Sequence, residues 1–91
     1  MHGDETLVRN LAGLVVDLAW FLESADDTVV DPDDALEQLE WMSHRFSQLP
    51  AEDRFRLIAL IRERVESESE PEFREFLKTF PEATGLLDAD D

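Results

Sequence analysis

The chain has 91 residues, of which 23 are acidic and 8 are basic, so its formal net charge is −15 at pH 7. A chain of this size has room for one thin core, and its 43% hydrophobic content, with 6 Phe and 2 Trp, is enough to fill one. The charge repels nucleic acid and anionic lipid, so the composition argues against both as partners and favours basic proteins.

Cysteine is absent, which excludes a disulfide framework, a thiolate metal site and a redox dithiol. The apolar run LAGLVVDLAWFL is interrupted by Asp17 and is too short to span a membrane. The acidic MHGDET before it is unlike the positive leader of a secretory signal. We therefore predict one helical domain over residues 1–91, located in the cytoplasm and not associated with a membrane.

The first predicted helix covers about residues 4–24, with Asp4 as its N-cap. One apolar stripe recurs at spacings of four and three and consists of Leu7, Leu11, Leu14, Leu18 and Phe21. Such a stripe is typical of a helix face that packs on a core, and Val8, Val15 and Leu22 widen it. We therefore expect this helix to be the central one.

The second predicted helix covers about residues 32–48 and follows the segment DDTVVDPDD. Asp31 has the features of an N-cap, because Pro32 suits the first helical position and acidic residues follow in the first turn. The same acidic run does not match a calcium-binding loop, which needs regularly spaced ligands and a central Gly. Its core face is expected to consist of Ala35, Leu39, Met42, Phe46 and Leu49.

Two further helices are predicted over about residues 50–67 and 70–80. The main stripe of the third is Phe55, Ile58, Ile61 and Val65, and that of the fourth is Phe73, Phe76, Leu77 and Phe80. We expect Ser69 to cap the fourth helix, Pro81 to end it and Gly85 to turn Leu86 back onto the core. The predicted fold class is thus all-α, a small bundle of three longer helices and one short C-terminal helix, followed by a flexible acidic tail.

Four arginines fall within the eleven residues RFRLIALIRER of the third helix. At about 100° per residue they do not share one face, and acidic residues lie between them, unlike a helix that reads DNA or RNA. Arg54 and Arg64 flank the apolar stripe, where their stems can cover apolar surface while their guanidinium groups reach carboxylates on other helices. We predict that these two residues brace an acidic bundle, in preference to binding an anion.

No residue pattern indicates catalysis or a cofactor. The two histidines, His2 and His44, are far apart, and no HExxH, phosphate-binding glycine loop or G-x-S-x-G sequence is present. Among 23 acidic residues, nothing distinguishes a pair of carboxylates that could act as acid and base. We therefore expect no enzymatic activity, no metal and no cofactor.

The two tryptophans lie outside the predicted core stripes. Trp41 falls with Glu37 and Arg45 on the polar side of its helix, and Trp20 lies at the edge of the polar side of the first helix. Large aromatic residues in such places are enriched at protein contacts, so these four residues are candidate contact residues. In the alternative interpretation, the fourth helix and the C-terminal tail cover Trp41, and Trp20 borders the core.

In size, acidity and expected four-helix content the chain is similar to the small immunity proteins that neutralise colicin-type nucleases by covering a basic surface. That family uses an adjacent pair of tyrosines at its contact surface, and this sequence contains no tyrosine, so no residue can be carried over. The leading hypothesis is a non-catalytic protein-protein interaction module, with self-association as a homodimer as one form of that interaction. The alternative is an immunity-like or antitoxin-like inhibitor that covers a basic enzyme.

Overall fold

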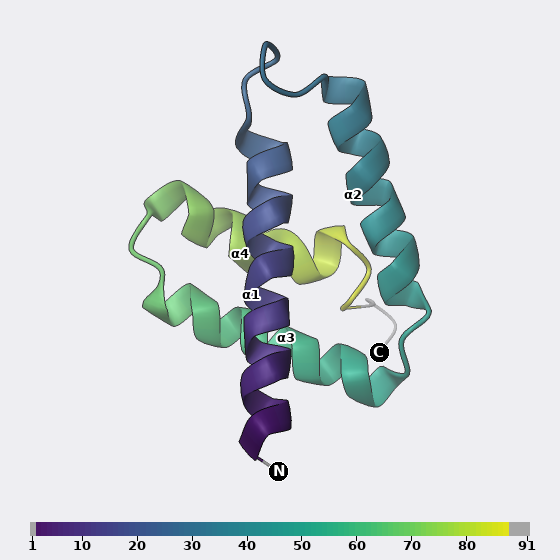
Figure 1. Cartoon of the computed structure of the whole chain (residues 1–91), viewed down its shortest axis with the longest axis vertical. Coiled ribbons are helices and arrows are strands. Elements are labelled where there is room, and N and C mark those ends of the chain that lie inside the picture. Colours follow the sequence, from purple (N-terminus) through teal and green to yellow (C-terminus); the bar gives the residue numbers. More distant parts are fainter. Residues whose placement is uncertain (1, 88–91) are drawn as a thin grey trace.

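The structure is a computed structural model that describes residues 2–87, with side chains from residue 4. In this part of the chain there are four helices and no strand: α1 (His2–Ser24), α2 (Pro32–Ser47), α3 (Ala51–Ser67) and α4 (Pro71–Ala83) (Figure 1). The predicted all-α fold with three longer helices and a short fourth one is confirmed. The predicted flexible tail, residues 88–91, lies outside the described residues.

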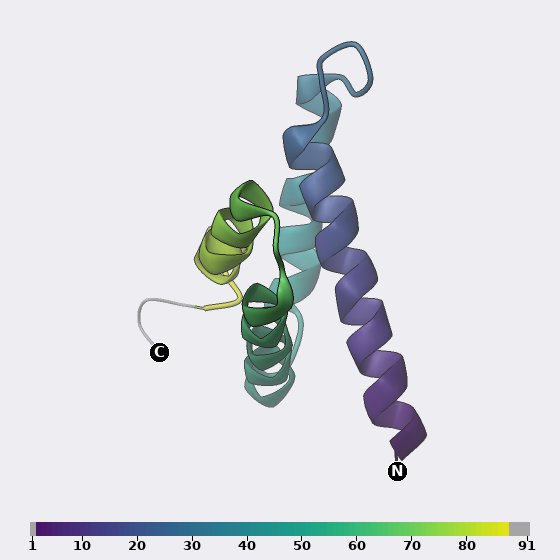
Figure 2. The same cartoon turned by 90° about the vertical axis from the view of Figure 1, so that its left-hand side faces the viewer.

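Helices α1 and α2 run in opposite directions beside each other, and α3 and α4 cross behind α1 (Figure 1). Figure 2 shows the same arrangement from the side, with α1 along one edge of the molecule and α3 and α4 on the other side. One face of α1 therefore packs on the rest of the chain, and the opposite face is directed outward.

The start of α2 follows the predicted capping. The Asp31 side chain accepts a hydrogen bond from the backbone N–H of Asp33 at 2.8 Å, and Pro32 occupies the first helical position. Two other predicted caps are wrong. Helix α1 begins at His2, which places Asp4 within its first turn, and the N-cap of α4 is Glu70 instead of Ser69. The acidic side chain of Asp4 still interacts favourably with the positive end of the helix dipole.

The predicted end of α4 before Pro81 is wrong, because the helix continues to Ala83 with Pro81 buried inside its last turn. Proline cannot donate to the carbonyl of Leu77, but so close to the helix end this removes only one helical hydrogen bond. The helix ends at the predicted turn, where Gly85 has a φ of 78°. The N–H of Leu87 then donates to the carbonyl of Pro81 at 2.8 Å, and Leu86 is fully buried, as predicted.

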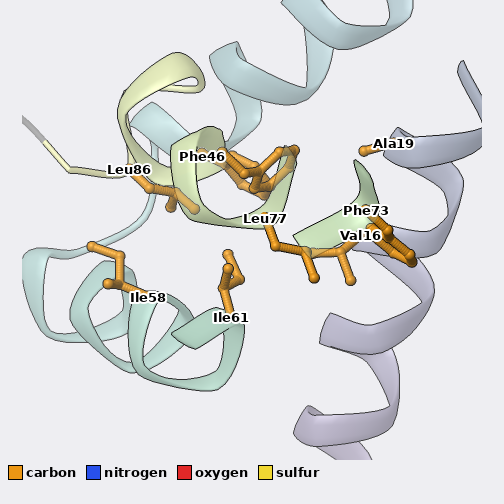
Figure 3. Close-up of a cluster of buried hydrophobic side chains, with 9 residues drawn as sticks. Val16, Ala19, Phe46, Ile58, Ile61, Phe73, Leu77 and Leu86 are labelled. Atoms are coloured by element: carbon orange, nitrogen blue, oxygen red, sulfur yellow. The ribbon is translucent and has the colours of Figure 1, made fainter. Parts of the chain in front are cut away.

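The core is a cluster of buried side chains to which all four helices and the C-terminal turn contribute (Figure 3). Its members from α2, α3, α4 and the turn are Phe46, Ile58, Ile61, Phe73, Leu77, Phe80 and Leu86. The predicted faces of α2 and α4 are confirmed. On α3, Ile58 and Ile61 are buried as predicted, but Phe55 at the start of the predicted stripe is 54% exposed.

Helix α1 packs on the core through a different face from the predicted one. Its buried residues are Ala12, Val16 and Ala19, all of them smaller than leucine. Small side chains on α1 leave room for large neighbours, and Val16 and Ala19 share the core cluster with Ile61 of α3 and Phe73 of α4. The leucines, which have the stronger tendency to be buried, are consequently left on the outer face.

Candidate functional site

The outer face of α1 carries a continuous row of exposed apolar side chains, which we call the α1 stripe. It consists of Leu7, Leu11, Leu14, Leu18 and Phe21, with exposed fractions of 57%, 51%, 58%, 59% and 48%. Together they present on the order of 500 Å² of apolar surface, which is within the size range of the largest patch on a typical monomer, and such patches are often functional. The α1 stripe is therefore a candidate surface for binding another protein.

Three ion pairs connect α1 to α3 in the orientation that leaves the α1 stripe outward. The guanidinium of Arg9 donates to Glu63 at 3.2 Å, and that of Arg64 donates to Asp17 at 3.0 Å. Arg56 donates to Glu5. Because these carboxylates and guanidinium groups lie along both helices, rotating α1 about its axis to bury the leucines would break all three pairs.

Arg64, one of the two residues predicted to brace the helices, makes further contacts within the α3–α4 corner. It donates to Glu68 at 3.2 Å, and its guanidinium lies 5.1 Å from the centre of the Phe73 ring. The backbone N–H of Glu70 donates to the Glu68 carboxylate at 3.1 Å. This hydrogen bond, with a smaller effect of Arg64, lowers the pKa of the Glu68 carboxyl below its usual value.

The other predicted brace, Arg54, is half-buried in the first turn of α3. Its bracing role stays a prediction. Arg9 and Arg56, which also connect the two helices, were not singled out in the sequence because their partners on the other helix are more than 50 residues away. Only the folded structure brings such partners together.

Replacing Arg64 by Met is expected to lower the free energy of unfolding by about 1–2 kcal/mol, since the apolar stem is kept while the ion pairs and the ring contact are lost. The matched control is Arg62→Met on the same helix, where the side chain is exposed and the change should stay within about 0.5 kcal/mol. Urea unfolding followed by circular dichroism measures both. Equal values for the two variants would contradict the bracing role of Arg64.

The two tryptophans have different environments. Trp20 is half-buried and stacks on Phe73, with ring centres 5.3 Å apart and planes 7° apart, and it also contacts Phe76. It therefore takes part in packing α1 on α4. Trp41 is 58% exposed, so the interpretation in which α4 and the tail cover it is wrong. Its ring stacks on His44 at 5.2 Å.

The four candidate contact residues are thus not brought into one site. Trp41 and Glu37 line the same open surface of α2, together with Glu40. Arg45 is exposed one helical turn further along α2, and Trp20 lies on α1 where it faces α4. The role of these residues in partner binding stays a prediction, and the structure divides them into an α2 group and one packed tryptophan.

The chain has a small cleft between α1 and α3, of about 150 Å³, lined by Arg9, Gly13 and Arg64 among others. Both arginines already contact carboxylates there, so an anion would have to displace Glu63 or Asp17. In the described part of the chain, no three His, Asp or Glu side chains are grouped so that they could hold a metal ion. Within the same residues, no helix is both long enough and apolar enough to cross a membrane.

Comparison with known proteins gives no match to a protein-family model, to a curated protein or to a solved structure. The similarity to immunity proteins therefore rests on size, acidity and helix content alone. Any functional conclusion has to come from the surface of the chain itself.

Sequence reasoning found the residues of the α1 stripe but assigned them to the core. Spacings of four and three alternate without interruption from Leu7 to Phe21. This pattern is shared by a helix that packs on a globular core and by a helix that pairs along a seam with another helix, so it does not distinguish a buried stripe from an exposed one.

Proposed function

We propose that the chain is a non-catalytic protein-protein interaction module that binds its partner through the α1 stripe. The observation that carries this proposal is the row of five apolar side chains, each about half exposed, on a helix that packs on the core through its other face. A helix with apolar residues at these spacings suits a partner helix or a hydrophobic groove. The lack of cysteine suits a reducing compartment, and we place this activity in the cytoplasm.

Site-specific photo-crosslinking in the cells that make the protein tests this proposal. A photoreactive phenylalanine analogue at Leu18 should yield covalent adducts, because this position lies in the middle of the α1 stripe. The same analogue at Glu75, whose side chain is 72% exposed on α4, serves as the control and should yield few. Equal yields at the two positions would contradict binding through α1.

A second candidate function, an inhibitor that covers the basic surface of a partner enzyme, is favoured by the α2 group. Exposed Trp41 lies beside Glu37 and Glu40 on a chain with a net charge of −15, which combines an aromatic anchor with attraction to positive surfaces. The photoreactive analogue at Trp41 would then capture a basic protein, and capture would fall steeply as salt is added. Adducts at Leu18 but not at Trp41 would exclude this mode.

A further inference from the structure

We propose that the partner of the α1 stripe is a second copy of this chain, and that the two α1 helices pair in antiparallel orientation about a twofold axis at the level of Val16. This inference rests on the proposed function, since it identifies the partner of the same surface. It is drawn from the register of the exposed residues, from the flanking side chains and from the placement of charge.

The register of the α1 stripe is complementary to itself in antiparallel pairing. With the axis level with Val16, Leu14 lies opposite Leu18 of the second copy, and Leu11 lies opposite its Phe21. Leu7 lies opposite Ala25, which continues the spacing of four and three beyond Phe21. Every residue of the stripe thus meets an apolar residue, and the two halves of the interface are identical, as an isologous dimer requires.

The flanks of the stripe match in the same orientation. On one side lie the half-buried Val8, Val15 and Leu22, of which Val15 also packs on the core of its own chain. Antiparallel pairing puts Val15 beside Val15 and Val8 beside Leu22 of the other copy. On the other side Asp17 approaches Asp17 of the second copy, but each carboxylate is already paired with Arg64 at 3.0 Å. Parallel pairing would instead place each Asp17 against the apolar Leu22 of the other copy.

The positions of the acidic residues at the two ends of α1 also favour the antiparallel orientation. Each copy has an acidic loop after α1 that contains Asp26, Asp27 and Asp31, all exposed. Parallel helices would bring the two loops together, and Asp4 would face Asp4. Antiparallel helices separate the loops by about 30 Å along the axis, which is several times the screening length at physiological salt.

The area is adequate for a dimer of moderate affinity. Specific interfaces cover about 600–1,000 Å² on each partner, and the stripe, at about 500 Å² before its flank is added, comes close to the lower end of that range. Because each copy carries a charge of −15, repulsion between the bodies opposes association. Salt should therefore strengthen this dimer, whereas it would weaken a complex with a basic protein.

Sedimentation equilibrium of the full chain at 50 mM and 500 mM NaCl tests the dimer. We expect dimers at tens to hundreds of micromolar and a dissociation constant several-fold lower at the higher salt concentration. Leu14→Asp should give a monomer with an unchanged helical circular dichroism spectrum. The matched control Leu36→Asp, at an exposed leucine on α2, should still dimerise. A wild-type chain that remains monomeric at about 1 mM in both salts would overturn the proposal.

The orientation is tested by disulfide trapping, for which the chain has no competing cysteine. Leu14→Cys and Leu18→Cys chains are mixed and allowed to oxidise in air. Antiparallel pairing predicts that the mixed 14–18 disulfide dominates, whereas dominant 14–14 and 18–18 disulfides would overturn the orientation. If the chain is monomeric but Leu18 crosslinks to a different protein in cells, the inference about the partner fails and the proposed interaction function stands.

Discussion

Replacing Val16 by Asp is expected to unfold the chain, whereas the same replacement at Leu18 should leave the fold intact. Val16 is 2% exposed and belongs to the core cluster, so a carboxylate there loses its hydration. The nearby cations Arg9 and Arg64 are already paired with Glu63 and Asp17. We expect a cost of about 4 kcal/mol or more, comparable to the whole stability of many small domains. Leu18 is 59% exposed, and Leu18→Asp should cost less than about 1 kcal/mol, mostly from its lower helix propensity.

The comparison is made by urea unfolding over a series of protein concentrations, extrapolated to the most dilute sample. Dilution matters because Leu18→Asp also removes any stabilisation that comes from pairing of α1 helices. A larger loss of stability for Val16→Asp than for Leu18→Asp is expected only if the leucine face of α1 is outward. A larger loss for Leu18→Asp than for Val16→Asp in dilute solution would mean that the leucine face is the buried one.

Much of the fold could be predicted from local signals. The capping of α2 by Asp31 and Pro32 depends on neighbouring residues only, so the sequence is sufficient to locate it. The inward faces of α2 and α4 were also predictable, because each has a single apolar face, with Phe46 and Phe80 at their centres. These two aromatic rings meet edge to face with centres 6.1 Å apart.

The orientation of α1 could not be predicted in the same way, because this helix is apolar on two sides. One side carries leucines, and the other carries Ala12, Val16 and Ala19. Residue size favours burying the leucines, whereas close packing against Phe73 and the adjacent rings favours the smaller residues. Which of the two apolar sides is buried depends on contacts between segments far apart in sequence. The spacing of apolar residues along α1 carries no information about those contacts.

The candidate site could not be predicted from the sequence for the same reason. The α1 stripe is exposed because α1 packs through its other face, and Arg9, Arg56 and Arg64 pair with carboxylates across the same α1–α3 contact. A helical wheel identifies partners for these cations within one helix, but not between helices. The sequence therefore predicts arginines that connect the helices of an acidic bundle. The structure adds that the α1 stripe is left exposed in this arrangement.

Replacing Leu86 by Ala is expected to lower the free energy of unfolding by about 3 kcal/mol, the range for a fully buried leucine. Leu86 is 0% exposed although it lies outside the helices, because the turn at Gly85 returns the chain to the core. The matched control is Leu36→Ala on α2, where the leucine is 57% exposed and the cost should be below about 1 kcal/mol.

Thermal and urea unfolding of both variants measure the difference. A small effect at Leu86 would show that the segment after α4 is not part of the cooperative unit, and that Leu77 and Phe80 close the core without it. A large effect would mean that the core made by the four helices is incomplete until the residues after Gly85 return to cover it. That dependence is expected of a small chain whose first helix buries Ala12, Val16 and Ala19 and leaves its leucines exposed.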